Sequence, residues 1–480
     1  MTTARTRRRL ARTACVVAAA TAVGAAVPAA QARPPRGDTA RVSEDPKGGQ
    51  LDGDSYGIGL TSDGRSLLFS STATGLVPGH TDAAEGLYVK DLRNGHVEQV
   101  DLADDGSRLD ASVYDASISG DGRYVAFSTA ADNVVPGQQK HAYDVFVRDR
   151  RTGRTELISA GTGSTADDQS IRRAVNPSLS WDGRYVAFAS DRTDLGAAVR
   201  RGRTNIYVTD RWTGTTRLVT VGADGTPADQ NSFTPSLSAD GRTVGFTSRA
   251  SNLLPPAQGP ADTSTGTSAG PADDPADDAT AAAPAPATGV RPRLAVPRFY
   301  PFYVWDARTG RISGASYDET GAFRASGQDG RISPDGRHAV YSVPQPGGRP
   351  GSHGIHLVVY VRELTTGTVT QVSTPLPGTT TDLSSTEGVM TYDSRWVYFT
   401  SDVETLVPDD TNQQTDVFRR DLWTGRTERV SLTQDGSQST ASSFTPLVDA
   451  LGGTVVFDAT DGNLVPGDTN NVTDVFRRRL

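Results

Sequence analysis

The sequence predicts an all-β protein: a seven-bladed β-propeller whose blades are four-stranded antiparallel sheets. Three observations lead to this prediction. A pattern of the type Ser-x-Ser-x-Asp-Gly-Arg-x-Val-x-Phe recurs seven times along the 480 residues. The composition has 50 glycines and only 7% aromatic residues, which is typical of short strands joined by tight turns. The last copy of the repeat lacks a fourth strand, and a matching strand stands near the N-terminus.

An aromatic residue at the end of the second strand marks each repeat. Successive markers are 58, 61, 58, 95, 58 and 58 residues apart, at Phe69, Phe127, Phe188, Phe246, Tyr341, Phe399 and Phe457. The interval of 61 contains three extra residues near 161–168. The interval of 95 contains a run rich in Pro, Ala and Asp at about 255–297. Because this run cannot bury enough apolar surface to offset its ordering entropy, we expect a disordered surface insertion.

Each repeat contains four strand candidates. The first is short, and an Asp-Gly-Arg turn leads into an alternating second strand such as 184–188. The Asp-Gly pair supplies the positive φ that a tight hairpin needs. A longer loop leads to the third strand, as at 144–149, and a Thr-Gly turn enters the fourth, as at 427–431. Four antiparallel strands per repeat favour a propeller over a β-solenoid, whose repeats are shorter and whose strands are parallel.

The two chain ends indicate that the ring is closed. The last repeat stops at its third strand, within 474–480. Val42 precedes the first marker by 27 residues, as Val430 precedes the last, so Val42 occupies a fourth-strand position. We therefore expect residues near 40–44 to complete the last blade and remove its exposed edge. The predicted propeller spans 40–480 as a single domain.

Residues 1–32 are predicted to be an export signal, followed by a short tail at 33–39. Five arginines precede an alanine-rich stretch, and Ala30-Gln31-Ala32 offers a small-x-small cleavage site. A retained anchor helix is the alternative. Cleavage near Ala32 would place the protein outside the cell or in the cell envelope and would remove Cys15, its single cysteine. No other segment is apolar enough to span a membrane.

The repeat resembles the TolB-like and WD-like β-propeller repeats of bacterial envelope and secreted proteins. The shared features are Ser-x-Ser-x-Asp-Gly-Arg-x-Val-x-Phe, a later Val-Phe/Tyr-Val-x-Asp and Thr-Gly, over about 40–480 apart from the insertion. The resemblance implies the propeller fold, and members include binding modules, protein-translocation partners and propellers attached to peptidases. The chain departs from TolB itself because it has seven repeats rather than six. It also has no room between Arg33 and Arg41 for a separate N-terminal α/β domain.

Function is expected on the face that carries the longer loops, because their length and charge vary between repeats while the short turns are uniform. We expect a secreted, monomeric, non-catalytic module that binds a protein, peptide or glycan there. The alternative is an extracellular hydrolase or lyase acting on polysaccharide or peptide, with loop carboxylates or histidines at the channel mouth. The net charge of −8 argues against a phosphate-binding surface for nucleic acid.

One repeat position just before the innermost strand is aromatic in four blades. These candidate ligand-binding residues are Tyr56, Tyr114, Phe233 and Phe444. They can rim the channel mouth and stack on a sugar or peptide, or they can pack between blades as large apolar side chains usually do. Arg172 and Arg173 in the same connection can receive an anionic group; the alternative is a solvated loop.

Two acidic loops are candidate metal sites. Their oxygen ligands would be Asp468, Asn470 and Asp474 in one loop and Asp410, Asn412 and Asp416 in the other. Such spacing can begin a Ca²⁺ site, which needs six to eight oxygens. The alternative is that these side chains cap loop amides. The sequence has no phosphate-binding loop, and no residue is assigned a catalytic role.

Overall fold

The computed structural model describes residues 38–78, 84–139, 141–162, 172–255, 299–327, 329–347, 354–460 and 462–480. These residues belong to one compact unit, Pro34–Leu480. The predicted export signal at 1–32 lies outside the described residues, and so does the predicted insertion beyond residue 255. Within the described parts, no helix has the length and apolar character needed to cross a membrane.

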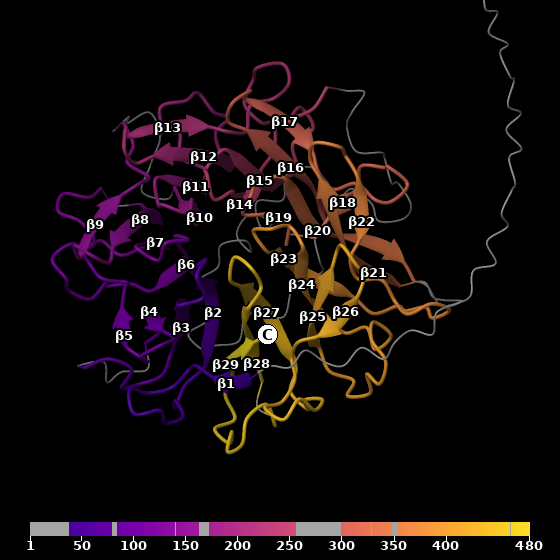
Figure 1. Cartoon of the computed structure of the whole chain (residues 1–480). Coiled ribbons are helices and arrows are strands. Elements are labelled where there is room, and N and C mark those ends of the chain that lie inside the picture. The colour runs from indigo at the N-terminus through magenta and orange to yellow at the C-terminus, as the bar shows by residue number, and fades with distance from the viewer. Residues whose placement is uncertain are drawn as a thin grey trace, which may run out of the picture. The chain divides into compact units, whose positions relative to one another are not determined.

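Seven sheets follow one another along the chain and are arranged around a common centre (Figure 1). This confirms the predicted seven-bladed propeller of four-stranded antiparallel blades. The first strands of blades 1 to 7 are β2 (Ser55–Leu60), β6 (Val113–Ile118), β10 (Ala174–Leu179), β14 (Ser232–Leu237), β19 (Arg331–Ile332), β23 (Ser385–Met390) and β27 (Ser443–Val448). The second strands are β3 (Ser66–Ser71), β7 (Tyr124–Thr129), β11 (Tyr185–Ser190), β15 (Thr243–Ser248), β20 (His338–Pro346), β24 (Trp396–Ser401) and β28 (Thr454–Ala459).

The outer half of each blade consists of its third and fourth strands. The third strands are β4 (Gly86–Asp91), β8 (Asp144–Asp149), β12 (Asn205–Asp210), β16 (Tyr300–Asp306), β21 (Ile355–Glu363), β25 (Asp416–Asp421) and β29 (Asp474–Arg479). The fourth strands are β5 (Val97–Gln99), β9 (Arg154–Leu157), β13 (Thr215–Leu218), β17 (Arg311–Gly314), β22 (Val369–Gln371), β26 (Thr427–Arg429) and β1 (Asp38–Arg41). The first strands lie nearest the centre in Figure 1 and contact the first strands of neighbouring blades.

Strand β1 closes the ring by pairing antiparallel with β29. Asp38 lies opposite Arg479, and Arg41 lies opposite Phe476. Beyond the strand, the Val42 N–H donates a hydrogen bond of 2.8 Å to the Val475 carbonyl. The prediction that the N-terminal strand completes the last blade is confirmed, with the strand beginning at Asp38. The last blade thereby gains the edge strand that its C-terminal segment lacks.

The core lies between adjacent blades and is built from their second and third strands. Both faces of these strands are buried, so they form nearly continuous apolar runs. Each marker aromatic packs against an aromatic residue of the third strand in its own blade. Phe127 and Phe146 stack with ring centroids 5.8 Å apart, and Phe399 and Phe418 repeat this geometry at 5.8 Å.

The recurring Ser-x-Asp-Gly-Arg sequence has a local hydrogen-bonding reason. In blade 3 the Ser180 hydroxyl donates to Asp182 at 2.9 Å and accepts the Tyr185 N–H at 2.9 Å. The Asp182 carboxylate also accepts the Arg184 N–H at 3.0 Å. Gly183 has a φ of +67°, which an L side chain rarely adopts. The motif therefore forms the tight turn between the first two strands.

Blades 4 and 5 differ from the predicted pattern. An extra strand, β18 (Ala325–Ser326), pairs with the start of β16 in blade 4. The first strand of blade 5 has only two residues, whereas β20 and β21 have nine each. A Cβ on Gly330 would lie 2.5 Å from the Phe302 ring, so the chain before β19 passes close to the neighbouring blade. This close approach accompanies the short inner strand.

Candidate functional site

A single repeat position on the inner strands brings together most of the polar chemistry at the centre. It lies one residue after the predicted aromatic position, and we call its seven residues the inner ring. They are Gly57, Asp115, Asn176, Thr234, Asp329, Glu387 and Thr445. Gly57 is buried, whereas the other six are half-buried and therefore partly open to solvent. Three of the seven are carboxylates, so this part of the molecule is acidic.

The inner strands are irregular at this position. Register shifts interrupt the pairing of the first and second strands, for example between Thr386 and Val389. Four inner-ring residues other than glycine have a positive φ: Asn176 at 54°, Thr234 at 47°, Glu387 at 57° and Thr445 at 55°. Such a conformation costs an L residue on the order of 1–3 kcal/mol, and strained positions of this kind cluster at functional sites. The repeated bulge makes the inner ring a candidate functional site.

Hydrogen bonds connect inner-ring residues of neighbouring blades. The Glu387 N–H donates to Asp329 Oδ2 at 2.9 Å, and the Thr445 N–H donates to Glu387 Oε2 at 2.8 Å. The Asn176 side-chain amide donates to Asp115 Oδ2 at 2.9 Å. A carboxylate of one blade thus accepts a donor of the next, which positions the acidic groups rigidly.

Glu387 has the most defined geometry of the three carboxylates. Its Oε2 accepts the Thr445 N–H and also the Thr400 hydroxyl, the latter at 3.0 Å. Its Oε1 has no hydrogen bond to any residue that the structure describes, and the side chain is only half-buried. Neither Glu387 nor Asp329 forms an ion pair with a described residue. One oxygen is held in place, and the other can accept a proton or an N–H.

The predicted aromatic residues lie beside the inner ring. Tyr56, Tyr114, Phe233 and Phe444 are the second residues of β2, β6, β14 and β27, and all four are half-buried. Two of them pack on rings at the start of a third strand in their own blade. The Tyr114–Tyr143 centroids are 5.4 Å apart and the Phe233–Tyr300 centroids 5.9 Å. Burial, with the negative charge of Asp115, raises the pKa of Tyr114. Their role in ligand binding stays a prediction.

The two predicted arginines contact a carboxylate of blade 3. Arg172 Nη1 lies 4.0 Å from Asp191 Oδ2, and the Arg173 backbone N–H donates to Asp191 Oδ1 at 2.7 Å. Burial raises the pKa of Asp191, and the two arginines oppose this increase. The structure places the pair at the entrance to β10 in blade 3, two and three blades away from the inner-ring carboxylates of blades 5 and 6. An anionic ligand for them stays a prediction.

An arginine from another segment lies beside the proposed ligands of each predicted calcium loop. In blade 7, Arg41 Nη1 lies 3.1 Å from Asp468 Oδ1 and 3.9 Å from Asp474 Oδ2. The Asn470 amide nitrogen donates to Asp474 Oδ2 at 3.0 Å. The amide therefore acts here as a donor, and a guanidinium supplies the positive charge that a calcium ion would bring.

The loop of blade 6 repeats this arrangement. Arg429 lies 3.3 Å from Asp410 Oδ1 and 3.4 Å from Asp416 Oδ2, and Asn412 donates to Asp416 at 2.9 Å. Burial raises the pKa of Asp410 to about 6, although Arg429 opposes the increase. No cluster of three His, Cys, Asp or Glu side chains suited to a metal occurs among the described residues. Calcium binding stays a prediction.

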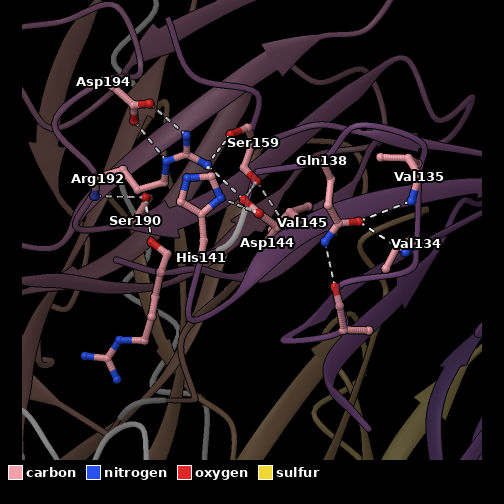
Figure 2. Close-up of polar contacts among 12 residues, drawn as sticks. Val134, Val135, Gln138, His141, Asp144, Val145, Ser159, Ser190, Arg192 and Asp194 are labelled. Atoms are coloured by element: carbon pink, nitrogen blue, oxygen red, sulfur yellow. Dashed lines mark hydrogen bonds and ion pairs between the residues drawn. The ribbon is translucent and has the colours of Figure 1, made fainter. Parts of the chain in front are cut away.

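Blade 2 carries a buried variant of the same loop (Figure 2). His141 Nδ1 lies 2.6 Å from Asp144 Oδ2, and the Ser159 hydroxyl donates to Asp144 Oδ1 at 2.6 Å. Arg192 of blade 3 donates to Asp144 at 2.8 Å and pairs with Asp194 at 2.9 Å. All five side chains are buried or nearly so.

This cluster of His, Asp and Ser does not have the geometry of a hydrolytic triad. The serine is bonded to the aspartate, whereas a nucleophile has to reach the free nitrogen of the histidine. His141 Nε2 is buried and has no hydrogen-bond partner among the described residues. The equivalent hydroxyl–carboxylate bonds, Ser431 to Asp416 and Ser43 to Asp474, recur in blades 6 and 7. The arrangement therefore belongs to the blade architecture. His80, in the equivalent loop of blade 1, lies outside the described residues.

The inner ring was not identified from the sequence. Its residues differ in type from blade to blade, so they do not form a motif. The available signal was positional, since they follow the same spacing of 58, 61, 58, 95, 58 and 58 residues as the markers. The position that follows the predicted aromatic residues holds a carboxylate in three repeats, at Asp115, Asp329 and Glu387.

Solved structures that are similar to the chain include other propeller proteins. The chain is similar to the β-propeller domain of the trilobed protease from Pyrococcus furiosus, at 12% identity and a TM-score of 0.47, covering 88% of this chain and 93% of that one. It is similar to the acylaminoacyl peptidase of Pyrococcus horikoshii at 12% identity and a TM-score of 0.44, covering 85% of this chain and 49% of that one. TolB from Acinetobacter baumannii matches at 14% identity and a TM-score of 0.35, over 89% and 79% of the two chains.

The presence of TolB among the matches agrees with a TolB-like propeller. No protein-family model matches the chain, and no curated protein matches it. At these identities the likeness shows the fold alone, and the chain spans only about half of the matched acylaminoacyl peptidases.

The main functional expectation, a non-catalytic binding module, is corrected by this comparison. Several of the matched solved structures are peptidases, which agrees better with the alternative of a hydrolase. The sequence could not distinguish the two functions, because the repeat pattern reflects turns and cores that both kinds of propeller share. The reaction has to be argued from the residues of this chain.

Proposed function

We propose that this protein is an extracellular peptide hydrolase that acts at its inner ring, with Glu387 as general base. The proposal rests on the hydrogen bonds and the backbone conformation of Glu387. Two donors hold Oε2, Oε1 has no hydrogen bond within the described residues, and the backbone is strained at a φ of +57°. A carboxylate fixed through one oxygen can receive a proton at the other without reorganising.

The reaction would be hydrolysis of an amide bond. Glu387 Oε1 takes a proton from a water molecule, and the water oxygen forms a bond to the carbonyl carbon of the peptide. The bond from that carbon to nitrogen then breaks, and the proton passes from Glu387 to the leaving nitrogen. The Thr445 N–H and the Thr400 hydroxyl keep the carboxylate in place during both transfers.

The charge of the inner ring favours peptides over neutral polysaccharides as substrates. Asp115, Asp329 and Glu387 provide three carboxylates in equivalent places, and the described residues supply no ion pair for the last two. Peptides carry an ammonium group at the amino terminus and on basic side chains, so such a site attracts them. The half-buried Tyr56, Tyr114, Phe233 and Phe444 would contact the flanking residues of the peptide.

A substrate panel tests this proposal. The chain from residue 33 onward is incubated with basic, neutral and acidic peptides and with polysaccharides, and products are identified by mass spectrometry. We expect cleavage of basic peptides, slower cleavage of the same peptides after acetylation of the amino terminus, and loss of cleavage in Glu387→Gln. Glu85→Gln, at an exposed glutamate, is the matched control. Absence of peptide cleavage, or a Glu387→Gln variant with full activity, overturns the proposal.

Export is part of the same proposal. The predicted signal at 1–32 would deliver the propeller to the outside of the cell, where peptides from the surroundings are available. Sequencing the amino terminus of protein recovered from the growth medium tests this step. A terminus at residue 33 agrees with cleavage after Ala32, and an intact terminus contradicts it.

A further inference from the structure

The face with the short turns carries two matching pairs of exposed aromatic side chains. In blade 3, Trp181 lies in the turn between the first two strands and Trp212 in the turn between the last two. Blade 6 has Tyr392 and Trp423 at the equivalent positions. Their exposed fractions are 48%, 67%, 50% and 72%, and no other aromatic side chain among the described residues is as exposed. Exposed aromatic groups of this size commonly mark interaction sites.

Trp212 and Trp423, which lie in the turns between the third and fourth strands, each pack on a guanidinium group. Arg184 lies 4.5 Å from the centre of the Trp212 ring and forms an ion pair with Asp210 at 2.6 Å. Arg395 lies 4.8 Å from the Trp423 ring, and its Nη2 is 2.8 Å from Asp421. One face of each indole is thus covered by the guanidinium, which leaves the other face for a ligand.

Trp181 and Tyr392, which lie in the turns between the first and second strands, are also held in fixed positions. Backbone hydrogen bonds link these turns around the ring: the Trp181 N–H donates to Ala239, and the Tyr392 N–H donates to Ala450, at 2.8 Å each. The Trp181 ring lies against Gly120 of blade 2, where an added Cβ would be 2.1 Å from the indole. Rigid placement of a ring reduces the entropy lost when a ligand stacks on it.

Blade 2 shows that the fold does not need these aromatic groups. Its Arg123 pairs with Asp149 at 2.6 Å and lies 4.8 Å from the Tyr124 ring, the same geometry as in blade 3. The two turn positions nevertheless hold Gly120 and Arg151. The exposed rings of blades 3 and 6 are therefore additions to a turn that forms without them.

We propose that blades 3 and 6 each bind a linear polysaccharide by stacking sugar rings on these paired aromatic side chains. The two turns of one blade are two strand spacings apart, roughly 10 Å, which is comparable with two successive sugar rings. The ion pairs Arg184–Asp210 and Arg395–Asp421 lie directly beside Trp212 and Trp423. Flat apolar faces next to planar charged groups match the faces and hydroxyls of a sugar, whereas a protein partner would favour a continuous apolar core.

Sedimentation with insoluble polysaccharides tests this inference independently of any hydrolytic activity. The full exported chain is mixed with cellulose, chitin and xylan, with immobilised gelatin as a protein probe. We expect it to sediment with at least one polysaccharide. Trp212→Ala or Trp423→Ala should weaken binding about 10-fold, in line with the loss of one aromatic stacking contact. The double variant should lose up to the product of the two factors, because two sites on one rigid body bind a long chain with avidity.

Leu451→Ala provides the matched control. Leu451 is 71% exposed and lies in the equivalent turn of blade 7, where no aromatic residue is present. This variant should bind as the unaltered chain does, and all variants should share its melting midpoint. The tryptophan emission should also shift to shorter wavelength when a soluble hexasaccharide of the bound polysaccharide is added. Failure to bind any of the three polysaccharides, binding to gelatin alone, or unaltered binding in the double variant overturns the inference.

Discussion

Glu387 Oε2 accepts a hydrogen bond of 2.8 Å from the backbone N–H of Thr445, the residue at the same repeat position in the next blade. Both residues have a positive φ, of 57° and 55°. The bond therefore holds two strained turns of the inner strands against each other across a blade boundary. A carboxylate that supports catalysis in our proposal is also part of the structure of the ring.

This double role predicts different effects for two substitutions of Glu387. Glu387→Ala removes the acceptor of the Thr445 N–H and the Thr400 hydroxyl, and leaving such groups unpaired costs about 1–3 kcal/mol of unfolding free energy. Glu387→Gln keeps an oxygen acceptor and should cost less than half as much, while it cannot take up a proton. Urea unfolding measures both. Equal stability of the two variants would contradict the structural role.

Substitution of Arg192 should lower the unfolding free energy strongly. Its guanidinium is buried between Asp144 and Asp194, at 2.8 and 2.9 Å. Arg192→Ala removes the guanidinium that lies between two buried carboxylates, and breaking a buried pair in this way costs about 3–5 kcal/mol. The exposed pair of Arg242 and Asp240 is the comparison: Arg242→Ala should change the unfolding free energy by less than about 1 kcal/mol. Similar losses of unfolding free energy in both variants would contradict this prediction.

Asp410 should make stability depend on pH. Burial raises its pKa in the folded protein to about 6, above the ordinary 3.8. Between these values the folded chain binds a proton that the unfolded chain releases, so the stabilisation is complete below about pH 4 and is lost as the pH rises through 6. The loss amounts to at most about 3 kcal/mol. Asp410→Asn should lack this pH-dependent contribution. Measuring the unfolding free energy of the unaltered chain and of the variant from pH 4 to 7 would show the difference. Parallel curves would contradict it.

The predicted calcium loops can be tested through their arginines. Arg429 lies between Asp410 and Asp416, so a calcium ion would have to displace its guanidinium. Arg429→Gln removes this competing charge and should increase any stabilisation by excess Ca²⁺ over chelator, measured as a shift of the melting midpoint. A calcium effect that is present in the unaltered chain and absent from the variant would show that the arginine is not a competitor. No calcium effect in either protein would reject the site.

Strand β1 should be required for a stable ring. It provides the edge of blade 7, and the Thr39 hydroxyl in it donates to the Leu432 carbonyl at 2.7 Å and accepts from Arg478 at 2.6 Å. A chain that begins at residue 45 removes the Thr39 hydroxyl from the buried Arg478 and the strand that pairs with the edge of β29, so it should melt at a much lower temperature. A peptide of residues 36–45 added in excess should restore part of the midpoint. An unchanged midpoint after truncation would disprove closure by β1.

The sequence alone determined the architecture of this protein. The Asp-Gly and Thr-Gly turns, the alternating strands and the spacing of 58 residues are local properties, and each is visible within one repeat. Ring closure also followed from the sequence, since Val42 and Val430 lie equally far from their markers. Repetition made these local signals reliable, because the same turn chemistry had to act in the same way seven times.

Only the tertiary structure decided which residues act together. Asp329, Glu387 and Thr445 are 58 residues apart in sequence and are joined by hydrogen bonds only because neighbouring inner strands meet at the centre. The charge beside Asp410 and Asp416 likewise comes from Arg429 on β26, which the loop sequence does not contain. Contacts between blades depend on how complete blades pack, and a repeat pattern describes each blade separately. For that physical reason the fold could be predicted from the sequence, whereas the candidate site could not.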